Sequence, residues 1–185
     1  YDDTFPELRH EFEPFLQCVV DGLAKEGVET LRADICRLAP EFDQAVQRFQ
    51  SEDVDLIITL HLAYSLSLES IAAFANVSCP ILLLDTTMDY DFSQNVNASR
   101  IMFNHGIHGV QDLACMLRRQ KIPYEIVAGH VSQSPVLHRA AGIAKAAYAA
   151  RCFKTSTALR IGRIFAGMGD FSVEESVLKD RLGIT

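Results

Sequence analysis

The hydrophobic residues of this chain follow two spacings. Short runs rich in Val, Ile and Leu are separated by longer stretches in which apolar residues recur every three or four positions. The short runs are typical of strands, and the longer stretches are typical of helices that bury one side. The pattern predicts strands at 28–35, 54–61, 79–87, 123–130 and 158–167. It predicts helices from Thr4 to Gly27, at 40–51, 66–76, 107–120 and 134–153, and after Ser172.

Several residue combinations mark where these helices begin and end. Thr4 and Glu7 have the spacing of a capping box, which predicts the start of the first helix, and Gly27 predicts its end. Pro14 lies inside this helix and removes a backbone hydrogen bond, so we expect it to kink or split the helix. Ser134–Pro135 has the sequence of an N-cap followed by a first-turn proline, which predicts the start of the long helix that follows.

Strands and helices alternate along the whole chain. Strands that are continuous Val, Ile and Leu runs are typical of parallel sheets covered by helices. The sequence therefore predicts a doubly wound α/β fold with a mainly parallel sheet and helices on both faces, as in flavodoxin-like and Rossmann-like domains. The glycine-rich fingerprint of dinucleotide-binding domains is missing from the sequence. The nearest match, GMGDFS at 167–172, lacks its third glycine.

Length, charge and cysteine usage narrow the class of protein. The 185 residues suffice for one domain with a substantial core, and the net charge of −7 argues against nucleic acid or an anionic membrane as a partner. No apolar run reaches the roughly 18 residues of a membrane span. The five cysteines are scattered and form no CxxC pair, which indicates reduced thiols, no structural zinc and a cytoplasmic location. We interpret residues 1–170 as one domain and 171–185 as the start of a connection to further domains.

Polar residues gather where the predicted strands end. Ligands of open α/β sheets bind outside the carboxyl ends of the strands, so these residues are candidates for a binding site. They are His61, Tyr64, Ser65, Asp85, Thr86, Thr87, Asn104, His105, His108 and His130. Their imidazole, hydroxyl, amide and carboxylate groups together suit a ligand with many hydroxyl groups, such as a sugar. Each residue alone could instead serve the fold, as a hydrogen-bonded strand end, a turn or an exposed helix residue.

The same residues allow other chemistry that the pattern supports less well. His105 and His108 could chelate a metal together with His61, His130 or Asp85, but a hard divalent ion needs more carboxylates than Asp85 alone. We therefore assign no metal ligand within this chain. No GxSxG motif is present, and no cysteine follows a strand beside a histidine in sequence, so nucleophilic catalysis is not indicated.

Three other features bear on the site or on assembly. The connection at 88–103 is the one long irregular stretch between predicted elements, and such loops are usually functional or mobile. His10 and His138 fall inside predicted helices, and we expect both at the surface. The small residues AAGIAKAAYAA within 134–153 favour close packing on the sheet over a helix contact between subunits.

Three stretches of this sequence resemble the amino-terminal region of the L-fucose and L-arabinose isomerase family. They are HLAYS after DLIITL, LLLDTT after CP, and NHGIHGVQDLACMLRRQKIPYEIVAGH. The spacing Asn104-x-x-x-His108-Gly109 matches the arabinose isomerase pattern Asn-Gln-x-x-His-Gly, and His105 stands where those enzymes usually carry Gln. The likeness covers roughly residues 1 to 175. Because an imidazole pairs with sugar hydroxyls differently from an amide, arabinose itself is not implied as the substrate.

The resemblance implies an aldose–ketose isomerase of three domains that assembles as a trimer or hexamer. A divalent ion, usually Mn²⁺, and two acidic residues would drive proton transfer through an enediol, and all of these would lie in downstream domains. Asn104, His105 and His108 would contact sugar hydroxyls in a site shared between subunits. The resemblance also implies that a first strand, with a polar substrate contact beside it, precedes Tyr1.

The sequence thus supports one main hypothesis and two alternatives. The main hypothesis is the amino-terminal domain of a metal-dependent sugar isomerase, with no confident catalytic residue in this segment. In it His105 and His108 bind the sugar, with Asn104 beside them and with His61, Tyr64, Ser65, Asp85 and Thr86 as weaker candidates. A proton-shuttle role for His108 is weaker than orientation of the sugar by hydrogen bonding. The first alternative is a free-standing sugar- or effector-binding module without catalysis, and the second, weaker one is a self-contained metallohydrolase.

Overall fold

The centre of the molecule is a small parallel β-sheet. A computed structural model describes residues 8–162, 165, 167–169 and 173–185. The described sheet has three strands, β1 (Ile57–Leu60), β2 (Ile81–Asp85) and β3 (Glu125–Ala128), in the order β1-β2-β3. Both strand pairs are parallel, with Ile57 opposite Ile81 and Leu82 opposite Glu125. The protein is therefore a mixed α/β structure built on a parallel sheet.

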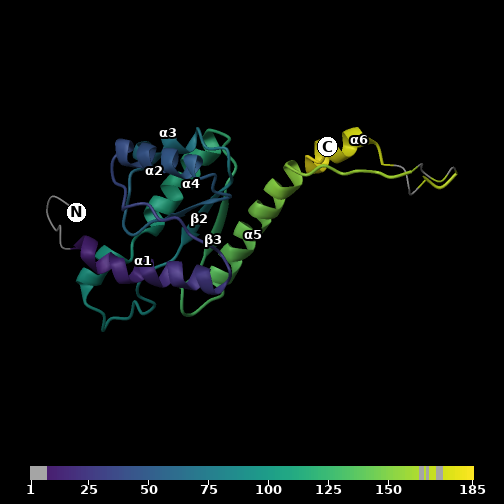
Figure 1. Ribbon diagram of the computed structural model, residues 1–185. Helices are drawn as coiled ribbons and strands as arrows, with labels where there is room; N and C mark the ends of the chain where they lie inside the picture. The colour runs from purple at the N-terminus through teal and green to yellow at the C-terminus, as the bar shows by residue number, and fades with distance from the viewer. Residues whose placement is uncertain (1–7, 163–164, 166, 170–172) are drawn as a thin grey trace.

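Helices cover both faces of this sheet. The described helices are α1 (Leu8–Lys25), α2 (Ala39–Ser51), α3 (Ser67–Phe74), the 3₁₀ helix η1 (Ala98–Phe103), α4 (Ile107–Arg119), α5 (Val136–Lys154) and α6 (Glu175–Leu182). Side chains of α2, α3 and α4 form one hydrophobic cluster with the sheet, and side chains of α1 and α5 form a second cluster. Figure 1 shows α1 on the opposite side of the sheet from α2, α3 and α4.

The central strand β2 explains why the core has two halves. Successive side chains of a strand point to opposite faces of the sheet. Ile81 and Leu83 belong to the cluster under α2–α4, whereas Leu82 and Leu84 belong to the cluster under α1 and α5. All four are at most 1% exposed. The stretch ILLL at 81–84 is apolar without interruption because both faces of this strand are covered.

Most of the predicted elements are confirmed, including the three strands of the sheet and the six α-helices. Gly27 ends α1 with a φ of +78°, and the N–H of Val28 donates to the carbonyl oxygen of Leu23 at 3.0 Å, which closes the helix end. The expectation that Pro14 splits the helix is wrong, because α1 runs through it without a break. Pro14 lies on the exposed side of α1, where water can satisfy the carbonyl oxygen left unpaired by its ring. The capping box of Thr4 and Glu7 lies outside the described residues.

Two predicted strands are wrong. Residues 28–35 form no strand, and no other strand of the described sheet lies beside them to pair with. The described part of 158–167 is also irregular, and its apolar side chains face solvent: Leu159 is 84% and Ile161 92% exposed. Residues 163, 164 and 166 of that stretch lie outside the described residues. An alternating or apolar pattern yields a strand only when a neighbour completes the ladder.

The entry into α5 also differs from the prediction. Pro135 is the N-cap residue of α5, and the Ser134 hydroxyl donates to the carbonyl oxygen of His130 at 2.8 Å instead of capping the helix. At the other end, α6 packs against α5, and Ser156 and Ala158 pair through their backbones with Thr185. Figure 1 shows that residues 155–162, which follow α5, extend away from the sheet. Ser172, the predicted cap of this last helix, lies outside the described residues.

Candidate binding site at the start of helix α4

The NHGIHG motif sits where α4 meets the carboxyl end of β1. Gly106 is the N-cap residue of α4, and Gly109 lies in its first turn. A Cβ atom built on Gly106 would overlap the carbonyl oxygen of His61, and one on Gly109 would come within 2.6 Å of the His61 Cδ2 atom. Both positions are therefore glycine because the helix start presses directly against the end of β1, which fixes its position.

His105 and His108 gather with Tyr64 outside this contact. The ring centres of His105 and His108 are 6.4 Å apart, and those of His108 and Tyr64 are 6.3 Å apart. His108 is exposed, Tyr64 is 50% exposed and His105 is half-buried. We call these three residues the histidine cluster. It forms a polar, aromatic surface at the carboxyl end of the sheet.

Hydrogen bonds to the backbone set the tautomers in the histidine cluster. The Nδ1 atom of His105 lies 2.6 Å from the carbonyl oxygen of Ile101, and that of His108 lies 3.3 Å from the carbonyl oxygen of His105. A carbonyl oxygen only accepts, so Nδ1 carries the proton in each ring. In the neutral form of His108 this leaves Nε2 as an acceptor, which can receive a hydrogen bond from a hydroxyl group.

His61 lies behind the cluster and is half-buried. Burial lowers the pKa of His61 to about 4, opposed by the negative charge of Asp112, so this imidazole is neutral near pH 7. Its Nδ1 atom is buried and makes no hydrogen bond within the described residues. Ser65 packs beside it, with its hydroxyl 3.0 Å from where a Cβ atom on Gly109 would be. In this structure His61 and Ser65, both half-buried, pack against the start of α4.

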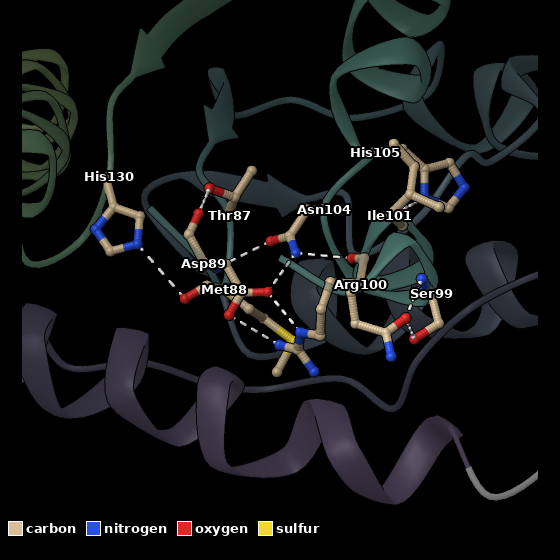
Figure 2. A network of polar contacts seen from close by, with 10 residues as sticks. Thr87, Met88, Asp89, Ser99, Arg100, Ile101, Asn104, His105 and His130 are labelled. Atoms are coloured by element: carbon tan, nitrogen blue, oxygen red, sulfur yellow. Dashed lines mark hydrogen bonds and ion pairs between the residues drawn. The ribbon is translucent and has the colours of Figure 1, made fainter. Parts of the chain in front are cut away.

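Asn104 points inward, away from its neighbour His105. Its side-chain oxygen accepts from the N–H of Asp89 at 2.9 Å, and its amide nitrogen donates to the Asp89 carboxylate at 2.6 Å and to the carbonyl oxygen of Arg100 at 2.8 Å. Arg100 also holds Asp89 through two hydrogen bonds, of 2.6 and 2.9 Å. We call Asp89, Arg100 and Asn104 the Asp89 network (Figure 2). The network ties the two ends of the 88–103 loop together.

Charge and ring contacts strengthen the Asp89 network. The hydrogen bond from Arg100, with that from Asn104, lowers the pKa of Asp89 despite partial burial, so its carboxylate stays ionised well below neutral pH. Arg100 also lies over the Phe103 ring, 4.6 Å from its centre, and Phe103 contacts Phe12 of α1 with ring centres 5.4 Å apart. The loop is thus fixed to the helix on the far face of the sheet.

The remaining predicted residues lie along the ends of β2 and β3. Asp85 is half-buried, and burial raises the pKa of its carboxyl group. Thr86 is buried, and its hydroxyl has no hydrogen-bond partner in the described part of the chain. The Thr87 hydroxyl donates to the carbonyl oxygen of Asp89 at 2.9 Å. None of these side chains belongs to the histidine cluster.

His130 makes contacts of its own. Its Nδ1 atom accepts from the N–H of Ser132 at 3.2 Å, its Nε2 atom lies 3.5 Å from the carbonyl oxygen of Met88, and its ring meets Tyr90 edge-on at 5.4 Å. Figure 2 shows His130 on one side of the Asp89 network and His105 on the other. The structure therefore brings Tyr64, His105 and His108 together, with His61 behind them, and places His130 elsewhere.

Sequence reasoning missed Arg100, which is central to the Asp89 network. It lies 11 positions from Asp89 in a long irregular loop, and no helical or strand period relates the two residues. It also missed Asp112, whose carboxylate accepts from the N–H of Ser67 at 3.0 Å and joins α4 to the start of α3. His10 and His138 are exposed on helices, as predicted.

Comparisons with known protein families and with curated proteins give no match. Among the residues that the structure describes, no three His, Cys, Asp or Glu side chains are placed to hold a metal ion. Within the same residues, no helix combines the length and hydrophobicity that crossing a bilayer requires.

Proposed function

We propose that this α/β structure is the amino-terminal domain of a metal-dependent aldose–ketose sugar isomerase related to the L-fucose and L-arabinose enzymes. The observation that carries the proposal is the histidine cluster. Two imidazoles and a phenol are held side by side at the carboxyl end of a parallel sheet, where α/β folds bind ligands. The amino-acid pattern of residues 104–109 agrees with that family.

The cluster offers the groups that a sugar needs. The Nε2 atom of His108 can accept a hydrogen bond from a hydroxyl group, and the Tyr64 hydroxyl can donate or accept one. The faces of these rings also suit the apolar C–H surface of a sugar. Because Gly106 and Gly109 fix the helix start against β1, these groups are positioned before a ligand arrives.

The proposal gives the other predicted residues different roles. His108 and His105 bind the sugar, Tyr64 is a further contact, and Asn104 positions His105 through the Asp89 network. His61 supports the site from beneath. The proposal places Mn²⁺ and the two catalytic acids in downstream domains and assigns no residue of this segment to the metal. Asp85 and Thr86 remain candidates for a contact from the β2 end.

The proposal also covers the arrangement of the whole protein. The sheet is doubly wound, in the flavodoxin-like manner, and the full-length chain assembles as a trimer or hexamer. A sugar bound between subunits would contact the histidine cluster of one subunit and the catalytic residues of another. The exposure of His108 and Tyr64 supports this, because a shared site needs a surface open to a neighbour.

The test uses the full-length protein with Mn²⁺ and a panel of aldoses. We expect ketose formation from at least one aldose, and a loss of about 10-fold in kcat/KM when His108→Ala removes a hydrogen bond to the sugar. His138→Ala, which removes an exposed histidine of α5, is the matched control and should change nothing. His105→Gln introduces the residue of the arabinose pattern and should shift the preference among aldoses.

Two results would count against the proposal. Unchanged kinetics in His108→Ala would reduce that residue to part of the scaffold. Tight sugar binding by the full-length protein without any ketose formation would favour a binding module without catalysis.

A further inference from the structure

Tyr64 of the histidine cluster lies in the segment 61–66, which joins β1 to α3. This segment has no regular secondary structure. Its first residue is held by α4, because a Cβ atom on Gly106 would overlap the carbonyl oxygen of His61. An irregular segment does not fix a side chain by itself. The position of the Tyr64 ring therefore depends on what holds the other end of the segment.

That other end is held by Asp112 of α4. Its carboxylate accepts from the N–H of Ser67, the first residue of α3, at 3.0 Å across 45 positions of sequence. Ser67 is only 4% exposed. Opening this bond would leave a buried N–H group without an acceptor, which costs free energy. The bond therefore keeps the start of α3, and with it the end of the segment, against α4.

The sequence at the start of α3 explains why another helix supplies this acceptor. Leu66 is the N-cap residue of α3, and its side chain has no oxygen atom that could accept from the first N–H groups of the helix. Asp112 supplies an acceptor from α4 instead. Its negative charge also lies at a helix N-terminus, where the helix dipole favours an anion. The cap of α3 is thus also a link between two helices.

One face of α4 carries all of these contacts. Gly106, Gly109 and Asp112 are spaced three positions apart and therefore lie along one side of the helix. They contact the start, the middle and the far end of the Tyr64 segment. His108 precedes Asp112 by one turn of the same helix. A single helix thus carries one ring of the histidine cluster and the groups that hold the segment of the neighbouring ring, 6.3 Å away.

We propose that Asp112 is a positioning residue of the sugar site, which keeps Tyr64 beside His108 by capping α3 from α4. The inference rests on the proposed function, in which both rings contact the sugar. Asp112 itself does not touch the sugar and acts through the N–H of Ser67. In the proposed function, proton transfer belongs to the downstream domains. Loss of the bond therefore weakens sugar binding and leaves the chemical step unchanged.

The first test is kinetic and uses the full-length protein with Mn²⁺ and an aldose that it converts. Asp112→Ala should raise KM about 5-fold with kcat unchanged, because one sugar contact is displaced. Asp112→Asn keeps an oxygen that can accept from Ser67 and should restore most of the loss. Glu69→Ala is the matched control, because the Glu69 carboxylate accepts from the N–H of Ala39 at the start of α2, at 2.8 Å, outside the histidine cluster.

Three kinetic results would overturn the proposal. An unchanged KM in Asp112→Ala would show that the bond does not position Tyr64. An equal rise of KM in Glu69→Ala would show that any lost helix cap has this effect. A KM in Asp112→Asn as high as in Asp112→Ala would show that the charge matters and the hydrogen bond does not.

A second test separates positioning from stability. Leu66→Ser gives α3 a cap of its own, which does not reach α4. The double variant Asp112→Ala/Leu66→Ser should regain thermal stability, while its KM stays about 5-fold above that of Leu66→Ser alone. It also replaces Asp112→Ala if that variant does not fold. Recovery of KM together with stability would show that Asp112 only stabilises the fold, and would overturn the proposal.

A third measurement needs no sugar. In the full-length protein labelled at Tyr and His, we expect a nuclear Overhauser contact between the ring protons of Tyr64 and His108. It should persist in Glu69→Ala and be lost in Asp112→Ala/Leu66→Ser. Persistence in the double variant would overturn the proposal. Loss of the contact in a protein that converts no aldose would refute the proposed function, yet support the role of Asp112 in positioning Tyr64.

Discussion

The Asp89 network and the histidine cluster are neighbours in sequence but have opposite characters. Asn104 and His105 are consecutive, yet Asn104 is 6% exposed with its amide bonded on both sides, whereas His105 turns outward toward His108 and Tyr64. In the network, charged and amide groups satisfy one another. In the cluster, His108 bonds to the backbone through Nδ1, and its Nε2 atom is an acceptor in the neutral ring. Polar residues that hydrogen-bond to one another within the protein hold the fold. Polar residues that face solvent are the candidates for binding a ligand.

The substitution with the largest expected effect, Gly106→Ala, should displace the histidine cluster and the Asp89 network together. Gly106→Ala places a Cβ atom against the His61 carbonyl oxygen, and backbone can relieve that overlap only by moving the start of α4. We expect the free energy of unfolding to fall by about 3 kcal/mol. Denaturant unfolding would measure it. Gly142→Ala in α5 is the control, because nothing lies within 4 Å of its Cβ position. Since alanine favours a helix more than glycine does, this variant should have a slightly higher free energy of unfolding. Equal behaviour of the two variants would contradict the close contact.

A second prediction separates His61 from the exposed histidines through pH. The pKa of His61 is about 4 in the folded protein, below the ordinary value of 6.5, so the unfolded chain takes up the proton first as the pH falls. Stability should therefore be complete above about pH 6.5, decline toward pH 4 and level off below it, with a loss of about 2 kcal/mol after allowance for solvent screening. Urea unfolding between pH 8 and pH 4 would measure this decline. His61→Gln should flatten it, and the exposed control His138→Gln should leave it in place.

A smaller effect is expected from the Asp89 network. Asn104→Ala leaves the N–H of Asp89 and the carbonyl oxygen of Arg100 without their partner, and we expect a loss of about 1.5 kcal/mol in the free energy of unfolding. This corresponds to a decrease in Tm of about 5 °C, measurable by thermal unfolding. Asn95→Ala, at an exposed position in the same loop, is the control. A neutral effect of Asn104→Ala would mean that the network does not hold the loop.

The smallest expected effect on stability comes from a substitution in the histidine cluster. His108→Ala removes an exposed ring whose bond to the His105 carbonyl oxygen is long, at 3.3 Å. We expect the free energy of unfolding to change by less than about 0.5 kcal/mol. Denaturant unfolding beside Asn104→Ala would test this. A loss as large as that of Asn104→Ala would place His108 among the residues that hold the fold.

The sequence predicts the elements of the core better than the direction of single side chains. The apolar run of β2 and the helix stripes beside it are confirmed because burial on both faces leaves a pattern in the residues themselves. Residues 28–35 also alternate, but a strand depends on a neighbour that the pattern cannot supply. Ser134 precedes a proline as an N-cap would, yet its hydroxyl bonds to His130. Such outcomes depend on contacts between residues distant along the chain.

In the candidate site, too, the sequence predicts which residues gather but not where each side chain points. The sequence predicts polar residues at the carboxyl ends of the strands, and Tyr64, His105 and His108 do lie together. The position of Asn104 could not be read from the motif, because its partners come from a long loop without a regular period. The two glycines of NHGIHG mark a close approach, but only the fold shows that the approach is to His61.

Asn104 points inward and His105 points outward, so the two positions differ in which substitutions they can accept. A change at position 105 alters the groups presented at the surface while the Asp89 network keeps the loop in place. Ligand preference could therefore drift by single substitutions at position 105 or 108 without a compensating change in the scaffold, whereas positions 104, 106 and 109 would accept very few alternatives.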